Sequence, residues 1–159
     1  MLSAPSVTDH ARRHDVAPAR QTVPMALLDH LGITVDDLPR AIAQFHPLLQ
    51  ELGYTKGYEE PGSVSWQNGS ETELILYPAR EPATGPHRHG RVGWQHLAFD
   101  VASRDEVDRL HRVALDAGWT AVRDPKRYPR FNERYYASFV EDGNGIRFEF
   151  AYNPPRDAG

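Results

Sequence analysis

The sequence contains no cysteine, and this excludes three kinds of chemistry. Disulfide bonds, thiolate metal ligands and a cysteine nucleophile all require that residue. Long apolar runs are also missing, because none approaches the ~18 residues of a membrane-spanning helix. The first 24 residues lack the apolar stretch of a signal peptide. We therefore expect a flexible polar tail at residues 1–24, a cytoplasmic protein and no membrane partner.

Excess charge of one sign is also small. The formal net charge is −4 over 159 residues, so a general nucleic-acid partner is not expected. The hydrophobic fraction of 40% and the aromatic fraction of 10% are those of an ordinary folded protein. The length predicts one domain, which we place at residues 25–155.

What the sequence does contain is an internal repeat. The segment "DHLGITVDDLPRAIAQFHPLLQELGYT", which ends at Thr55, resembles "QHLAFDVASRDEVDRLHRVALDAGWT", which ends at Thr120. Each has a polar residue, His and Leu near its start, and a valine five residues after that His (His30 and His96). Each ends in Gly, an aromatic residue and Thr.

A second correspondence follows in the same order. "NGSETELILYP" at residues 68–78 and "NGIRFEFAYNP" at residues 144–154 both place Glu four residues after Asn-Gly, and Pro five residues later. Glu73 thereby matches Glu149. Two ordered matches predict a duplicated module, with module 1 at about 26–78, a Pro/Gly/Arg-rich linker at 79–93 and module 2 at about 94–154.

Both modules predict the same element order, βαβββ, and therefore an α+β fold. Helical spacing of apolar residues covers 38–52 and 104–117, and each segment is followed by a glycine suited to a helix C-terminus. Strands are expected at 27–35, 54–58, 63–67 and 72–77, and at 94–101, 119–122, 135–141 and 146–152. Module 2 also has an insertion, residues 123–134, which we expect to be a loop.

The repeat singles out His30, Glu73, His96 and Glu149. Each His begins the first strand of a module and each Glu lies in the last strand. A carboxylate in an apolar strand such as 146–152 needs a cation, a proton or hydrogen-bond donors. Two imidazoles and two carboxylates that converge would form a site for Zn, Ni, Fe(II), Mn or Co. Taken singly, each His could instead be structural and each Glu could face solvent.

The paired modules, with "DHLGITVDDL", "WQHLAFDV" and "EDGNGIRFEF", resemble the glyoxalase/bleomycin-resistance/dioxygenase group, the vicinal oxygen chelate superfamily. The resemblance covers about residues 26–154. It implies two βαβββ modules that form a cupped mixed β-sheet with flanking helices. It further implies a divalent metal in the cup, ligands at His30, Glu73, His96 and Glu149, and a small-molecule substrate with neighbouring oxygens.

The resemblance leaves three functions open. A four-ligand site resembles glyoxalase I, a lyase or isomerase in which Glu149 or Glu73 would detach and act as the base. If Glu73 is not a ligand, a 2-His-1-carboxylate triad suits Fe(II) and extradiol ring cleavage. Such dioxygenases place Tyr ten residues before the ligand Glu, where this chain has Phe139. Antibiotic-binding relatives lack the metal ligands, and the retention of all four positions argues against that reading.

Substrate clues come from aromatic and basic residues. The predicted pocket wall comprises Trp66, Tyr135, Tyr136 and Phe139, together with Arg134, although these aromatic residues could equally be core. Eight of the 18 Lys and Arg residues lie in segments 78–93 and 123–134, namely Arg80, Arg88, Arg91, Arg123, Lys126, Arg127, Arg130 and Arg134. They would form either a basic rim for an anionic substrate or simply solvated loops. A homodimer is favoured over a monomer, because sheet edges in this architecture often pair.

Overall fold

The computed structural model describes residues 28–69, 72–81 and 85–155, so the tail expected at 1–24 lies outside the described residues. Module 1 runs through β1 (His30–Val35), α1 (Leu38–Glu51), β2 (Thr55–Glu60), β3 (Ser63–Asn68) and β4 (Thr72–Pro78). Module 2 runs through β5 (Leu97–Asp100), α2 (Arg104–Asp116), β6 (Thr120–Arg127), β7 (Tyr136–Glu141) and β8 (Arg147–Tyr152). The order confirms the predicted α+β fold of two βαβββ modules.

One element is longer than expected. Strand β6 continues to Arg127 and so takes in the first part of the insertion at 123–134, which the sequence predicted as a loop. It remains paired with β7, for example at Arg123↔Phe139 and Lys126↔Ala137, and the register shifts on either side of Arg123. Such bulges absorb extra residues and turn the strand without ending its pairing. The insertion is therefore attached to the sheet that carries Glu149.

Both helices begin and end as the sequence predicts. The side chain of Asp37 accepts a hydrogen bond from the Arg40 amide, and Ser103 does the same for Glu106, so each is an N-cap. At the other ends Gly53 has φ 84° and Gly118 has φ 87°, the left-handed conformation that favours glycine. Neither helix in the described part of the chain is long and apolar enough to cross a membrane.

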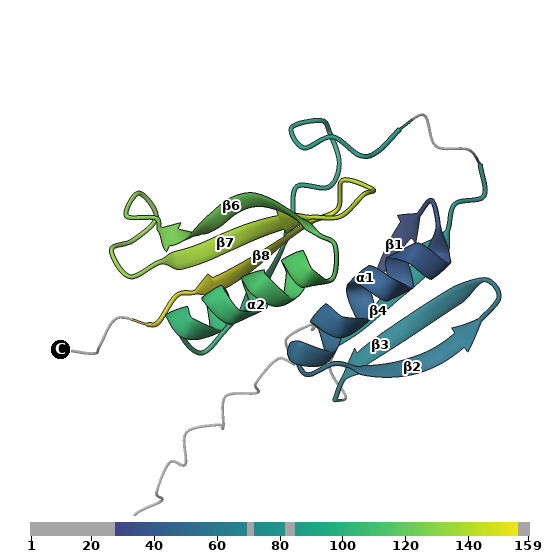
Figure 1. Ribbon diagram of the computed structural model, residues 1–159, viewed down its shortest axis with the longest axis horizontal. Coiled ribbons are helices and arrows are strands. Elements are labelled where there is room, and N and C mark those ends of the chain that lie inside the picture. The colour runs from purple at the N-terminus through teal and green to yellow at the C-terminus, as the bar shows by residue number, and fades with distance from the viewer. Residues whose placement is uncertain (1–27, 70–71, 82–84, 156–159) are drawn as a thin grey trace, which may run out of the picture.

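The strands form two four-stranded mixed sheets, β1-β4-β3-β2 and β5-β8-β7-β6. The first strand of each module pairs in parallel with the last, and the remaining pairs are antiparallel. One helix covers one face of each sheet, and Figure 1 shows the two sheet-and-helix units side by side. Among the described strands, β1 and β5 each pair on one side only, so the two sheets of a single chain remain separate.

The two modules share one hydrophobic core between their helix-covered faces. Phe45 on α1 has its ring centroid 4.8 Å from that of Trp119 and 5.5 Å from that of Phe148, and both partners belong to module 2. A hydrogen bond also joins the two modules: Trp119 Nε1 donates to the Gln44 carbonyl at 3.0 Å. Among the described elements, no helix covers the opposite face of either sheet.

The linker is anchored to module 2 near its last hairpin. The His87 amide donates to the Asn144 carbonyl at 2.8 Å, and the His87 ring contacts the Trp94 carbonyl at 2.7 Å. A Cβ at Gly145 would lie 1.9 Å from the His87 carbonyl oxygen, so only glycine fits at this crossing. The anchored linker carries its next residues, including His89, to the open face of the second sheet.

Candidate active site

The open face of module 2 carries the first predicted pair, His96 and Glu149. Alternation along β8 turns Phe148 and Phe150 toward the core and Glu149 to the opposite face. The imidazole Nε2 of His96 lies 2.9 Å from Glu149 Oε2. The Glu149 side chain is only 4% exposed, whereas His96 is 31% exposed. The two aromatic neighbours of Glu149 in the sequence therefore lie on the opposite face of the sheet from its carboxylate.

Tyr135 supplies the second contact of this carboxylate. Its hydroxyl donates to Glu149 Oε1 at 2.9 Å, so both carboxylate oxygens have a partner. Burial raises the pKa of the Tyr135 hydroxyl well above its usual value, and the adjacent Glu149 carboxylate raises it further. The phenol consequently keeps its proton and remains a donor at neutral pH. This arrangement answers how a buried carboxylate is stabilised in an apolar strand.

The second predicted pair lies on the open face of module 1. His30 on β1 is the register partner of Glu73 on β4, and partners in adjacent parallel strands point to the same face. The Gln67 amide donates weakly to Glu73 Oε1 at 3.4 Å, and His30 Nδ1 lies 2.6 Å from Asp29 Oδ1. The His30 side chain is 56% exposed, so this pair is more open to solvent than its counterpart.

The two pairs lie on separate sheets of the chain. Across the described residues, no three His, Asp or Glu side chains converge closely enough to hold a metal ion. Each sheet offers one imidazole nitrogen and one carboxylate, which are donor types that Zn, Ni, Mn, Co and Fe(II) accept. The donor chemistry of each pair thus fits a dication, but one pair supplies only half of the predicted ligand set.

A pocket of about 450 Å³ opens beside His96 and Glu149. Its wall includes Tyr135 and Phe139, two of the predicted substrate-binding residues. Further lining residues are His89, Arg123, Arg130, Phe131, Asn132 and Arg147. Phe139 also belongs to a small apolar cluster with Tyr128, Ala137 and Ala151, which packs behind this wall. The insertion at 123–134 therefore builds one side of the pocket.

Three predicted pocket residues lie elsewhere. Trp66 is fully buried in the shared core, where its indole N–H donates to His46 Nδ1 on α1 at 3.1 Å. The Tyr136 hydroxyl donates to Asp108 on α2 at 2.8 Å, on the helix-covered face. Arg134 lines a neighbouring surface depression rather than the pocket of Glu149. Strand alternation separates adjacent residues, so Tyr135 and Tyr136 cannot both face one pocket.

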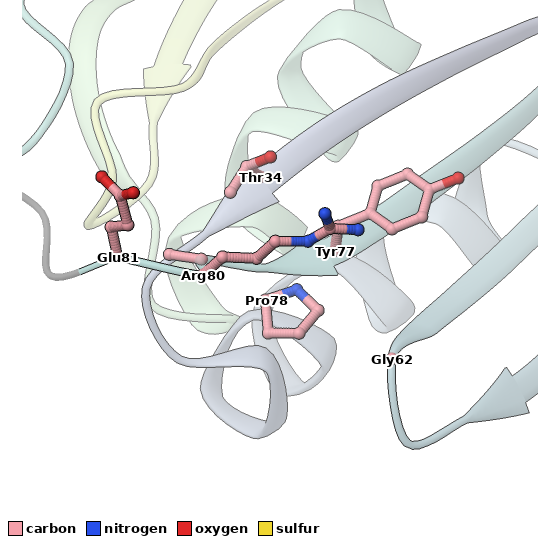
Figure 2. Close-up of a pocket in the computed structure, with 7 residues that line it drawn as sticks. Thr34, Gly62, Tyr77, Pro78, Arg80 and Glu81 are labelled. Carbon is pink, nitrogen blue, oxygen red and sulfur yellow. The ribbon is translucent and has the colours of Figure 1, made fainter.

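A second cavity, of about 640 Å³, lies on the open face of module 1. It is lined by Thr34, Tyr77, Pro78 and Arg80 among others, and Figure 2 shows the Arg80 side chain extending toward the Tyr77 ring. Thr34 follows His30 by four residues on the same strand, which is about 13 Å in extended chain. This cavity is therefore at the far end of β1 from the predicted ligand pair.

A comparison with protein families agrees with the two-module fold. The model of the glyoxalase/bleomycin resistance protein/dioxygenase superfamily matches residues 27–150. The chain belongs to this superfamily. The match includes both modules and all four predicted ligand positions, and it confirms the resemblance to vicinal oxygen chelate proteins.

Three individual proteins are moderately similar to this chain. The "putative glyoxalase" of Bacillus halodurans has a TM-score of 0.67 and 31% identity, over 79% of this chain and 95% of that chain. The uncharacterized protein YqjT of Bacillus subtilis is 28% identical over 77% of this chain and 95% of its own length. The "putative ring-cleaving dioxygenase MhqA" of Bacillus subtilis is 27% identical over 79% of this chain, which spans only 40% of that protein.

Several residues that line the pocket were not predicted from the sequence. Arg147 precedes Glu149 by two positions, so strand alternation alone would have placed it on the same face. Phe131 and Asn132 lie in the insertion, where no periodic pattern shows which residues turn inward. Asn132 accepts hydrogen bonds from the amides of Arg134 and Tyr135, which turns the chain back into β7.

Proposed function

We propose that this protein is a divalent-metal enzyme of the lyase or isomerase type that acts on a small substrate with neighbouring oxygens. His30, Glu73, His96 and Glu149 would hold the metal ion. The observation that carries the proposal is the repeated pairing of one imidazole with one carboxylate on the open face of each sheet. In module 2 this pairing lies in the wall of a pocket large enough for a small organic molecule.

We further propose that the complete site forms between two copies of the chain. In one chain the two pairs are on separate sheets, and the described residues give neither β1 nor β5 a second neighbouring strand. A free strand edge readily pairs with another chain. In a twofold dimer, module 1 of one copy can face module 2 of the other, which brings the two half-sites together twice.

The chain's own groups supply orientation, a base and water exclusion. A bound dication polarises substrate oxygens and stabilises negative charge that develops on them. Glu149 is held by Tyr135 at Oε1 and faces His96 at Oε2, so its carboxylate is fixed beside the pocket. In the proposed reaction Glu149 or Glu73 removes a proton from the substrate carbon and the other returns it. Phe139 and Tyr135 shield that carbon from water.

Mixed dimers test both parts of the proposal. One chain carries His30→Ala and Glu73→Ala, and the other carries His96→Ala and Glu149→Ala. Neither variant alone retains a complete site, but half of the randomly mixed dimers regain one of two sites. After the two chains are unfolded, mixed and refolded together, we expect about a quarter of the wild-type metal content by elemental mass spectrometry. Wild-type protein taken through the same refolding is the control.

The possible outcomes distinguish the proposal of a metal enzyme from the proposal of a site shared between two chains. Metal in the wild type but none in the mixed dimers would reject the shared site and retain a metal site within one chain. A wild type that refolds and binds no divalent metal would reject the enzyme proposal itself. Gel filtration of each variant shows whether the dimer persists when the ligands are removed.

Ring cleavage is the second candidate function, and Tyr135 favours it. This phenol lines the pocket and contacts Glu149, which would compensate for Phe139 at the position where ring-cleaving dioxygenases carry Tyr. The similarity to MhqA points the same way. His30, His96 and Glu149 would then bind Fe(II), and Glu73→Gln would leave the metal content unchanged. Oxygen consumption with catechol in the Fe(II)-loaded protein distinguishes this function from isomerisation.

A further inference from the structure

Two arginines of the insertion carry their guanidinium groups to the pocket that contains Glu149. Arg123 Cζ lies 5.5 Å from the ring centroid of Phe139, and Arg130 Cζ lies 4.6 Å from that of Phe131. Both arginines and both rings line the pocket. Stacking on a ring face orients a guanidinium group while its N–H donors remain available at the edge.

These two charges have no carboxylate partner among the ion pairs of the described residues. The third arginine of the pocket, Arg147, is different, since its side chain is only 13% exposed and lies 2.7 Å from Glu141. Asp124 follows Arg123 directly but has its carboxylate 3.6 Å from His111. The pocket is therefore lined by two positive charges that lack an ion-pair partner in the described part of the chain.

We propose that Arg123 and Arg130 form a carboxylate-binding subsite, so that the substrate is an organic acid. Its carboxylate would bind the planar guanidinium donors, which match a carboxylate better than a point charge does. Its carbon skeleton would pack on the aromatic wall of Phe131, Tyr135 and Phe139. The placement of its neighbouring oxygens at the His96–Glu149 pair rests on the proposed function.

The position of Arg123 and Arg130 at the pocket is not explained simply by exposed arginines in solvated loops. Arg127 lies on the same strand as Arg123 and is also exposed, but it pairs in register with Tyr136 and does not line the pocket. Arg127→Gln therefore removes the same charge from the same strand without touching the proposed subsite. It is the matched control for Arg123→Gln.

Two probe pairs of equal shape test the subsite by isothermal titration calorimetry. They are 3,4-dihydroxybenzoate with 3,4-dihydroxybenzamide, and benzoate with benzamide. The full chain is loaded with Zn²⁺, so that no oxidation occurs. We expect the wild type to bind each carboxylate about 10-fold more tightly than its amide. Arg123→Gln and Arg130→Gln should each reduce carboxylate affinity about 5-fold and leave amide affinity within about 2-fold. Arg127→Gln should change neither.

Several results would overturn the subsite. They are equal wild-type affinity for acid and amide, equal losses for both probes in Arg123→Gln, or the same loss in Arg127→Gln. Melting curves confirm that each variant is folded before titration. A benzoate preference in protein that binds no metal would keep the subsite and reject the proposed metal enzyme. Stoichiometric metal binding without any carboxylate preference would reject the subsite alone.

Discussion

The two modules have the same fold and the same His–Glu pairing, but they place the pair in different surroundings. In module 1 the His30 side chain is 56% exposed and Glu73 has only a weak contact with Gln67. In module 2 Glu149 is 4% exposed and is held by Tyr135 beneath the insertion at 123–134. The two modules thus share the predicted ligand positions, and in the described structure the insertion adds a pocket wall beside the pair of module 2. In the proposed function the second module contacts the substrate, and the first completes the metal site.

The two helices also differ in the residue that each places at one equivalent buried position. Counted from the N-caps Asp37 and Ser103, Phe45 in α1 and His111 in α2 occupy the same position. Both are buried. Phe45 packs on two aromatic rings of the other module, whereas His111 Nε2 lies 3.6 Å from Asp124 on β6. Only the first module therefore contributes a large aromatic residue from this position to the shared core.

The largest expected effect comes from breaking that shared core. Phe45→Ala removes contacts with Trp119 and Phe148 and leaves a cavity, which should lower the free energy of unfolding by about 3–5 kcal/mol. His111→Ala at the equivalent position should cost less, about 1–2 kcal/mol. Urea unfolding monitored by tryptophan fluorescence measures both. Similar losses in the two variants would contradict the asymmetry between the modules.

Removing a carboxylate from each pair should have the next largest effect. Glu149→Gln is expected to weaken divalent-metal affinity by more than about 100-fold, because a buried and oriented ligand is lost. Glu73→Gln should weaken it by about 10-fold, because that carboxylate is less rigidly held. Competition with a chromogenic chelator gives both constants. An unchanged affinity in Glu73→Gln would indicate the three-ligand iron site.

Replacing the residues that orient the two carboxylates, Tyr135 and Gln67, should change metal affinity less than replacing the carboxylates themselves. Tyr135→Phe removes the 2.9 Å hydrogen bond to Glu149 and should lower metal affinity about 10-fold. Gln67→Leu removes the 3.4 Å contact to Glu73 and should lower it less than about 3-fold. Tyr136→Phe is the control, since its hydroxyl contacts Asp108 on the other face. A loss in Tyr136→Phe equal to that in Tyr135→Phe would argue for a general effect on the fold.

The sequence predicted the elements well because the repeat and the alternation are local patterns. Glu149 between Phe148 and Phe150 shows both the success and the limit of such patterns. Alternation places the carboxylate opposite the rings, but it does not show which face a helix covers. For the same reason Trp66, taken for a pocket residue, proved to be core. Whether matching positions meet within one chain or between two depends on how whole modules dock, and no local spacing encodes that.

The smallest expected effect is the contribution of His111, on the second helix, to the pH dependence of the free energy of unfolding. Burial lowers the pKa of His111, although Asp124 partly opposes this, so the folded protein holds the imidazole in its neutral form. The unfolded chain takes up that proton first, near pH 6.5, because its histidine is solvated. The free energy of unfolding should therefore be greatest above pH 6.5 and fall as the pH drops below it.

His111→Leu tests this contribution without breaking a hydrogen bond of Nδ1, which is buried and has no partner among the described residues. The variant should retain most of its stability at pH 7.5 and lose less stability than the wild type between pH 6.5 and pH 5. If the wild type and His111→Leu lose stability in parallel, the acid sensitivity lies outside α2. A flatter pH profile of stability in His111→Leu would mean that His111 contributes to the acid sensitivity of the wild type. Module 1 has Phe45 at this position, which does not titrate.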